Sequence, residues 1–305
     1  MGRYIARRLA LLPLSLLLVA LITFVILRLT GNPVEIFLDV NSTPEQIAEL
    51  TARLHLDEPI PVQFFIFLRD LMTGDFGESL QFNAPAAGIV LERLGATLTL
   101  ASTGLGLAMT LGIGLGLVCA VQRDRAADFV ITSVAVAGQS MPSFWLGILL
   151  IQLFALKLGW LPTSGAGGIQ HIIMPAFTIS AFLLPNIILI TRASVLDLSH
   201  EQFVVAARSK GLSRGRVLIT HILPNAFNPI LSFLGIQIGA LIGGSIITET
   251  IFAWPGVGRL ILNSIAHRDV PVVEAAVLII AVGIALTNLA VDLLQMLIDP
   301  RVRRQ

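Results

Sequence analysis

The chain has 305 residues, of which 55% are hydrophobic and 13% are charged, and its formal net charge is +1 at pH 7. A soluble globular domain usually carries about 25% charged residues, and the mean hydropathy here is +0.86. These values exclude a disordered chain, a collagen-like chain and an ordinary soluble enzyme, and they indicate a polytopic membrane protein. The small net charge gives no field that would favour nucleic acid. The single cysteine, Cys119, allows neither an internal disulfide nor a cysteine-based metal cluster.

Six segments are long and apolar enough to cross a bilayer as helices. A spanning helix needs roughly 20 mostly apolar residues, and each Asp, Lys or Arg at its centre would cost roughly 2.5–3.5 kcal/mol on insertion. The windows without Asp, Glu, Lys or Arg are Leu9–Leu27, Leu94–Gln122, Phe129–Leu156, Leu158–Thr191 (most apolar over Ile172–Ile190), Val217–Thr248 (most apolar from about Ile230) and Ala275–Val291, the last extending past Asp292 to Ile298. We therefore predict an all-α membrane protein with six transmembrane helices.

The first apolar segment, within residues 1–29, is predicted to remain in the protein as a membrane helix. Arg3, Arg7 and Arg8 before it are also typical of a signal peptide. However, the apolar stretch is longer than a usual signal-peptide core, and no small-x-small cleavage site follows it.

The distribution of Lys and Arg predicts the orientation in the membrane. With six spans, the side that holds both termini carries Arg3, Arg7, Arg8, Arg123, Arg125, Arg192, Arg208, Lys210, Arg214, Arg216, Arg301, Arg303 and Arg304. The other side carries the smaller set Arg28, Arg53, Arg69, Arg93, Lys157, Arg259 and Arg268. The positive-inside rule therefore places both termini in the cytoplasm.

Residues 30–93 form a predicted segment outside the membrane, before a five-helix core over residues 94–305. Thr43 and Gln46 make a capping box for a first short amphipathic helix. A second one is expected over Val62–Met72, whose phenylalanines suit the membrane surface, and Gly74 should end it.

Small residues recur at every fourth position in two of the spans. One set is Gly104, Ala108, Gly112, Gly116 and Ala120, and the other is Gly235, Gly239 and Gly243. Such a face allows close backbone contact in lipid, either inside one bundle or with a second, similar subunit. Pro142 and Pro185 lie inside the third and fourth spans and can bend them.

The segment 192–229 between the fourth and fifth spans is the only large predicted cytoplasmic piece. Ser199 is expected to cap a helix that runs to about Ser209, and Gly211 is a natural left-handed stop. Ser213 is expected to cap a second helix that Pro224 ends. Arg208, Lys210, Arg214 and Arg216 make the outward face basic, which ordinary positive-inside charge also explains.

This segment resembles a motif of the permease subunits of binding-protein-dependent ABC importers: Glu-Ala-Ala, three residues, Gly, nine residues, Ile, one residue, Leu-Pro. The residues in register are Ala206, Ala207, Gly211, Leu223 and Pro224, whereas Val205 replaces the Glu and His221 replaces the Ile. Glu201, one helical turn before Val205, is the alternative acid. 

The rest of the chain extends the resemblance over nearly its full length. The matching segments, in order, are MGRYIARRLA, STPEQIAELTARLHLDEPIPVQF, GDFGESL, RLGATLTLA, MPSFWLGILL, LGWLPTSG, ETIFAWPGVGRL, RDVPVV and VDLLQMLIDPRVRR. They are similar to the dipeptide/oligopeptide/nickel permease family. The resemblance implies a type I importer fold, a bacterial inner-membrane location, a second homologous permease subunit, two ATPase subunits and an extracytoplasmic solute-binding protein. Short peptides are the first expectation for the substrate, and the alternatives are nickel or another metal chelate, glutathione and an opine-like solute.

The resemblance also implies where the ATPase subunits touch this chain. The expected contact residues are Val205, Ala206, Ala207, Arg208, Lys210, Gly211, Leu223 and Pro224. A P-loop needs Gly directly before its Lys, but Lys157 follows Leu156 and Lys210 follows Ser209. ATP and Mg²⁺ are therefore expected on the partner ATPases, this chain is expected to be non-catalytic, and no cofactor is expected in it.

Polar residues inside the spans are the candidates for the translocation pathway. They are Gln139, Ser140, Asn186, Gln237 and Asn288. The five histidines show no zinc-like spacing, so no metal site is expected. A stand-alone secondary carrier or channel is the rival from another class, and the lack of charged residues at mid-membrane argues against an ion-coupled carrier. A membrane scaffold or an intramembrane enzyme is a third alternative, which no catalytic motif supports.

Overall fold

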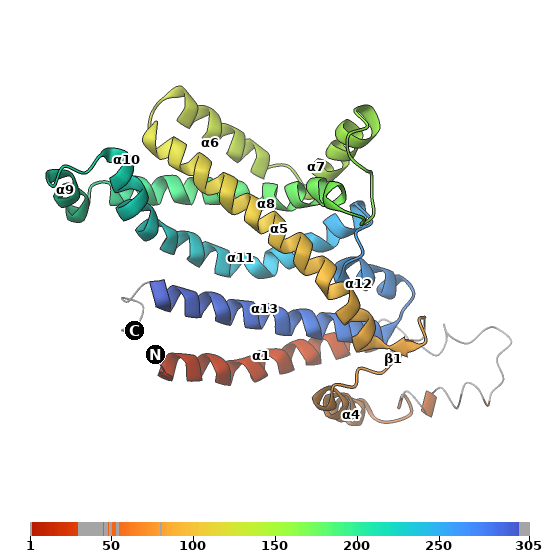
Figure 1. The fold of residues 1–305 in the computed structure, drawn as a ribbon. Coiled ribbons are helices and arrows are strands. Elements are labelled where there is room, and N and C mark those ends of the chain that lie inside the picture. The colour runs from red at the N-terminus through yellow and green to blue at the C-terminus, as the bar shows by residue number, and fades with distance from the viewer. Residues whose placement is uncertain are drawn as a thin grey trace. The chain divides into compact units, whose positions relative to one another are not determined.

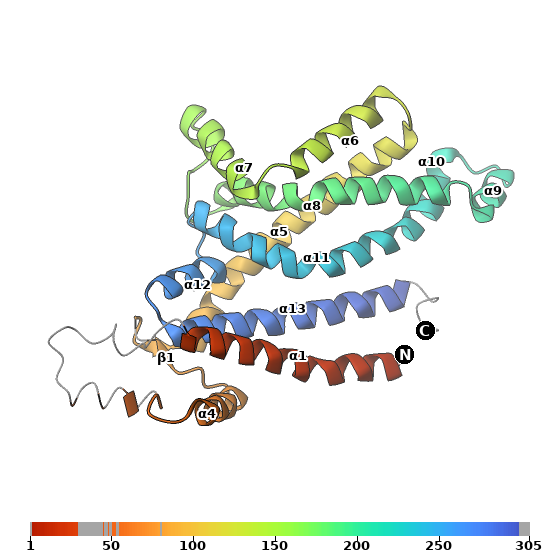
Figure 2. The same ribbon diagram turned by 180° about the vertical axis from the view of Figure 1, so that it is seen from behind.

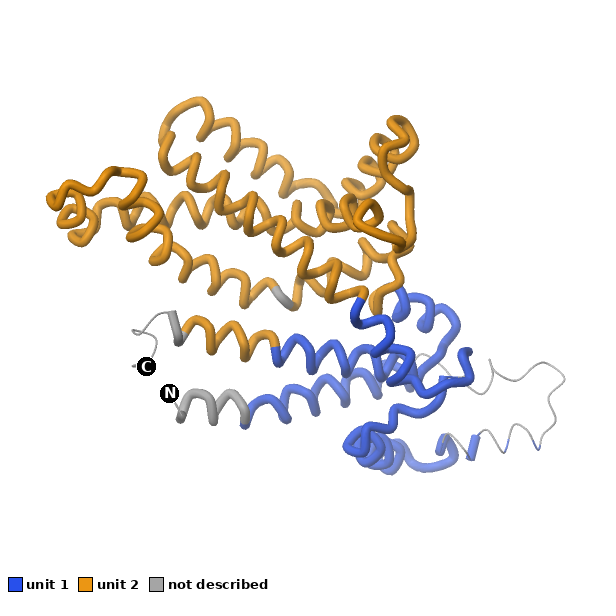
Figure 3. Tube along the Cα trace, in the orientation of Figure 1, with its two compact units in different colours: residues 1–95, 259–286 blue, residues 96–258, 287–305 orange. Residues whose placement is uncertain are grey.

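The structure is a computed structural model that describes residues 2–29, 45, 48, 51–52, 55–79 and 81–298. Figure 3 colours its two compact units, which consist of residues 1–95 with 259–286 and of residues 96–258 with 287–305. Over the described ranges the units are built from helices and one short β-hairpin (Figure 1). The predicted all-α class is therefore confirmed for the spans.

The first unit contains the N-terminal helix and the segment that follows it. Its elements are α1 (Gly2–Leu29), α4 (Ile60–Thr73), β1 (Glu78–Ser79), β2 (Ala84–Pro85), the start of α5 (Ala86–Val121), the end of α12 (Val257–Ala266) and most of α13 (Val270–Ile298). The expected second amphipathic helix is confirmed as α4, and Gly74 ends it with φ +78°. The capping box at Thr43 and Gln46 lies outside the described residues.

Aromatic packing joins α4 to α1 within this unit. The ring of Phe24 lies 5.3 Å from that of Phe64 and 5.7 Å from that of Phe67, measured between centroids. On other positions of α4, Phe65 is 71% exposed and Met72 is 89% exposed. Exposed apolar side chains of this kind suit a helix that lies at the membrane interface.

The second unit is organised around one long, buried helix. Its elements are most of α5, then α6 (Ala126–Gln139), α7 (Ser143–Leu150), η1 (Ile151–Lys157), α8 (Ile169–Leu198), α9 (Gln202–Ser209), α10 (Arg214–Val217), η2 (Leu218–Ile222), α11 (Leu223–Ile251) and the first residues of α12. Both views show α6, α7 and α11 beside α8 (Figures 1 and 2), and these helices contact it. The main core includes Leu100 of α5, Ile179, Leu183 and Ile187 of α8, and Ile230 of α11.

The small residues of α5 serve packing inside this unit. A Cβ atom added at Gly104 would lie 2.8 Å from the Ile179 side chain, one at Gly112 would lie 2.6 Å from Ile187, and one at Gly116 would lie 2.6 Å from Thr191. These glycines therefore let α5 and α8 approach closely. In α11, Gly235 similarly approaches Val291, whereas a Cβ at Gly239 or Gly243 would meet no atom within 4 Å.

The predicted third span is interrupted. The helices α6 and α7–η1 meet at an angle of 105° around residues 140–142, as the position of Pro142 suggested. Pro185, by contrast, lies within the unbroken helix α8. By length and composition, five described helices can cross a membrane, or six if the bent pair is one span.

Several helices extend beyond the charge-free windows and so carry charged residues near their ends. They are Asp128 in α6, Arg192 in α8, Glu249 in α11, and Glu274 and Asp292 in α13. Asp128 is 4% exposed and Glu249 is fully buried. Each needs polar partners, because burying an isolated charge is costly.

Candidate functional site

The basic loop (residues 192–229) contains two short helices joined at a glycine, as predicted, but with different ends. Ser199 closes α8, where its Oγ donates a hydrogen bond to the Val195 carbonyl, and Glu201 is the residue that precedes α9. The expected capping role of Ser199 is therefore wrong. Gly211 has φ +80°, which confirms the left-handed stop. Ser213 precedes α10 in an extended conformation, as expected.

The expectation that Pro224 ends the second helix is also wrong. The chain continues without a break from α10 through the π-helical turn η2 into α11. Pro224 is the second residue of α11 and directly follows the π-helical turn, where its missing N–H leaves one backbone hydrogen bond of the continuous helix unmade. The second short helix is thus continuous with the long helix α11.

An apolar cluster fixes the basic loop to the ends of the longer helices. It contains Val204 and Ala207 of α9, Val217 of α10, Ile222 and Ala226, together with Ala120 of α5 and Val195 of α8. Figures 1 and 2 show α9 and α10 at the end of α8 that is remote from α7. The cluster therefore packs the loop against the ends of α5 and α8.

The motif residues of the basic loop divide into a packed set and an exposed set. Ala207 is 8% exposed and belongs to the apolar cluster, and Leu223 is half-buried. The exposed residues are Val205, Ala206, Arg208, Lys210, Gly211 and Pro224. Val205, at the motif's acidic position, is 59% exposed. The exposed set forms a surface that a partner can reach. This surface lacks the acidic residue of the motif, because Val205 stands in its place.

A buried ion pair joins α6 to α8. Arg192 donates from Nε to Asp128 Oδ1 and from Nη2 to Asp128 Oδ2, both at 2.7 Å. Asp128 Oδ2 also accepts the backbone N–H of Asp124 at 3.1 Å. This pair was not predicted from the sequence. The available signal was an acid and a base at the same predicted membrane side of two neighbouring spans.

A hydrogen-bond network lies near the C-terminal end of α11. Thr97 of α5 donates to Glu249 Oε1 at 2.8 Å and accepts the Val257 N–H at 2.8 Å. Trp254 Nε1 donates to the Ala96 carbonyl at 2.9 Å. A Cβ at Gly256 would lie within 2.3 Å of the Glu249 carboxylate, so only glycine fits there. The segment ETIFAWPGVG therefore packs its turn against α5.

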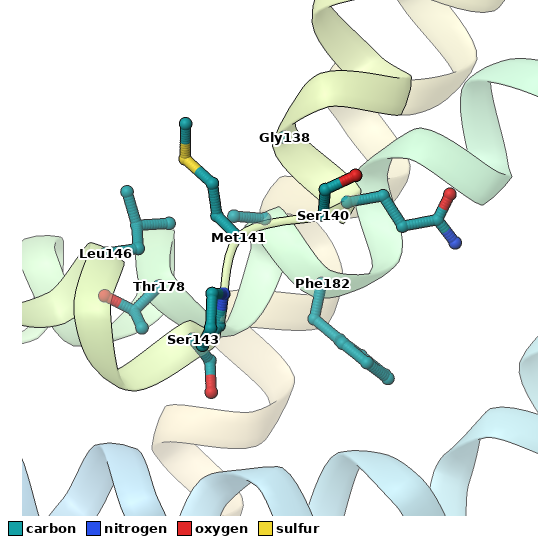
Figure 4. A pocket seen from close by; sticks show the side chains of 10 residues that line it. Gly138, Ser140, Met141, Ser143, Leu146, Thr178 and Phe182 are labelled. Atoms are coloured by element: carbon teal, nitrogen blue, oxygen red, sulfur yellow. The ribbon is translucent and has the colours of Figure 1, made fainter.

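A cavity of about 310 Å³ lies where α6 and α7 meet (Figure 4). It is lined by Gly138, Gln139, Ser140, Met141, Pro142, Ser143, Leu146, Thr178, Ala181 and Phe182. Figure 4 shows side chains from the α6–α7 connection and from α8 around it. Proline produces this arrangement, because it cannot donate the backbone hydrogen bond that would continue α6.

The cavity is lined by two of the five predicted pathway residues, and a third is hydrogen-bonded to one of them. Gln139 and Ser140 line it, and Gln139 Nε2 lies 3.4 Å from Asn186 Oδ1. Gln237 of α11 and Asn288 of α13 do not line it. Ser143 and Thr178 are polar lining residues that were not predicted from the sequence.

With this geometry established, comparisons define the class of protein as an inner-membrane transport permease. Residues 112–304 match the family model described as a binding-protein-dependent transport system inner membrane component, and residues 1–101 match the N-terminal membrane component of the same systems. The chain belongs to this family, and within it to the ABC importer permeases of the peptide/nickel type.

Individual relatives cover the whole chain. The glutathione transport system permease proteins GsiC of Salmonella choleraesuis (strain SC-B67) and of Escherichia coli (strain K12) are each 38% identical over 304 residues, which is 99% of this chain and 99% of theirs. A structure of the MetNI methionine ABC transporter in an inward-facing conformation aligns with a TM-score of 0.57 and 16% identity, covering 69% of this chain and 96% of that chain. This likeness supports the fold.

Proposed function

We propose that this chain is one permease subunit of an ATP-driven importer for glutathione or a short peptide of similar size. The full-length relationship to the GsiC permeases carries this proposal. The relatives favour glutathione, one of the expected alternatives. Because glutathione is itself a tripeptide, this substrate is chemically similar to the short peptides that were expected first. 

The chain is proposed to form half of the translocation pathway in the bacterial inner membrane. A second homologous permease forms the other half, and a solute-binding protein delivers the substrate on the outer side. Two ATPase subunits bind ATP and Mg²⁺ on the cytoplasmic side of the membrane, where both termini and the basic loop lie. Neither lysine of this chain has the preceding glycine of a P-loop, which supports hydrolysis by the partners.

The basic loop is proposed to receive the movement of the ATPases. Its exposed residues Val205, Ala206 and Gly211 offer a contact surface, while Ala207 anchors α9 in the apolar cluster. Movement of the surface is then passed to α8, to which α9 connects, and to α11, which continues α10. Rearrangement of α8 and α11 would open the pathway alternately to the two sides.

The test is uptake of labelled glutathione into vesicles that contain the complete importer and its binding protein. We expect uptake that requires ATP and both types of partner. A vesicle preparation with this chain alone should show none. Transport by the chain without any ATPase would support the stand-alone carrier or channel and would falsify the proposal.

The same assay tests the loop through Gly211. Its φ of +80° lies outside the range that proline can adopt, so Gly211→Pro should abolish uptake and binding-protein-stimulated ATP hydrolysis while membrane insertion remains. Gly211→Asn is the matched control, because Asn tolerates left-handed backbone, and a Cβ there meets no atom within 4 Å. Uptake at the wild-type rate by the Gly211→Pro variant would show that the basic loop does not couple the ATPases to transport.

A further inference from the structure

We infer that the cavity at the α6–α7 junction is a binding subsite for an uncharged, amide-bearing part of the transported solute, such as a peptide bond with its flanking side chain. This inference rests on the proposed function, which puts a peptide-like solute in contact with the membrane helices. The volume of about 310 Å³ is at the lower end of the range for small-molecule pockets. It therefore suits part of a short peptide.

The lining residues set the chemical class of this ligand. Gln139 offers a side-chain amide and Ser143 offers a hydroxyl group. The hydroxyl groups of Ser140 and Thr178 already donate to backbone carbonyls of their own helices, so toward a ligand they can only accept. The other lining residues are apolar or glycine. None of the ten is Asp, Glu, Lys, Arg or His. A charged group that entered the cavity would lose water without gaining a counter-charge.

The same lining disfavours a metal ion as the group bound here. Nickel and related ions prefer imidazole nitrogen or thiolate sulfur, and harder ions prefer carboxylate oxygen. The ten lining residues supply none of these ligands. The cavity thus disfavours a bare metal ion, whereas a metal chelate, the alternative that the family resemblance left open, brings its own ligands and is not distinguished from a peptide by this argument.

The junction also offers backbone groups to a ligand. The N–H groups of Trp145 and Leu146 both donate to the Pro142 carbonyl. The N–H group of Ser143, a lining residue, precedes the first intrahelical hydrogen bond of α7, so it has no acceptor within that helix. Together with the Gln139 amide and the hydroxyl groups, the junction provides both donors and acceptors, which is the complement that a peptide bond requires.

Gln139 is the residue that we expect to contact the solute directly. Its hydrogen bond to Asn186 is exposed and, at 3.4 Å, longer than the common range for such bonds. The amide can therefore exchange this partner for a group on the solute at little cost. Asn186 would then act as a positioning residue.

The experiment measures KM for uptake by the complete importer in vesicles, with glutathione and alanyl-alanine as probes. For Gln139→Leu we expect KM to rise about three- to tenfold, which is the effect of losing roughly one hydrogen bond. The matched control is Gln152→Leu, the same change at an exposed residue of η1 outside the cavity, and it should stay within twofold of wild type. Gln139→Glu should raise KM more for glutathione, which is anionic, than for the net-neutral alanyl-alanine.

The outcomes separate this inference from the proposed function. If the wild-type importer carries neither probe, the proposed function fails first. If wild type carries them and Gln139→Leu matches Gln152→Leu, the subsite is overturned while the proposed function stands. Should Gln139→Leu fail to assemble, Ser140→Ala makes the smaller change, and an unaltered KM in that variant overturns the subsite. Stimulation of ATP hydrolysis by the loaded binding protein checks that coupling is intact.

Discussion

At the scale of single residues, the buried groups of this protein are held by specific polar partners. The Asp128–Arg192 pair is bidentate, and the Asp128 side chain is 5% exposed. Removing one partner of such a pair leaves the other charge buried and uncompensated. The pair therefore secures the junction of α6 and α8 beside the basic loop.

Arg192→Met should destabilise the protein strongly because it leaves the Asp128 carboxylate without its partner. In soluble proteins such a change costs about 3–5 kcal/mol, so the midpoint of thermal unfolding in detergent should fall clearly. Replacing both partners, with Asp128→Leu and Arg192→Met, should recover part of the loss.

The control for this prediction is the exposed pair of Arg69 and Asp70, whose Arg69 side chain is 71% exposed. Surface pairs contribute little to stability, so Arg69→Met should leave the midpoint nearly unchanged. Equal shifts for Arg69→Met and Arg192→Met would show that the buried pair has no special structural role.

At the scale of elements, the contact of α5 with α8 depends on which glycines face inward. Gly104, Gly112 and Gly116 have α8 side chains within 3 Å of an added Cβ, whereas Gly106 and Gly114 have no atom within 4 Å. The two sets alternate along one helix. Only the glycines that face α8 permit its close approach, whereas a side chain at the other glycines would meet no neighbour.

Gly112→Val should therefore destabilise the second unit more than Gly114→Val. Both changes have the same effect on helix propensity, but only the first forces Ile187 to move. Overpacking of this kind typically costs about 1–3 kcal/mol. Thermal unfolding of the two purified variants gives the comparison, and a Gly114→Val variant as unstable as Gly112→Val would contradict the packing seen here.

At the scale of the whole molecule, the Asp128–Arg192 ion pair indicates how many times the chain crosses the membrane. It places the start of α6 beside the end of α8. A helix of 30 residues such as α8 is about 45 Å long, so we expect its two ends to lie on opposite sides of the membrane. The chain between Asp128 and Ile169 must then cross, and we expect the bent pair to be one span of six.

Labelling of single cysteines with a membrane-impermeant reagent on intact cells tests this topology, in a Cys119→Ser background. We expect Ser164→Cys to be labelled from outside and Ser209→Cys to be protected, because six spans put them on opposite sides with both termini inside. Five spans, with the bent pair returning to its own side, would reverse the two results.

The amino-acid sequence by itself determined the membrane class, the positions of the apolar spans, the amphipathic helix α4 and the left-handed stop at Gly211. These features depend on composition, on hydrophobic periodicity and on the backbone freedom of a single residue, all of which are local. The family resemblance that followed from the motifs was also confirmed.

Only the tertiary structure decided which polar and small residues come together. It joined Arg192 to Asp128, Thr97 to Glu249, and Gln139 to Asn186, and it directed the glycines of α5 toward α8. It also showed that Pro224 begins a long helix where an end was expected. The physical reason is that such contacts join residues far apart in the chain, and their partners are set by helix packing, which no local pattern encodes.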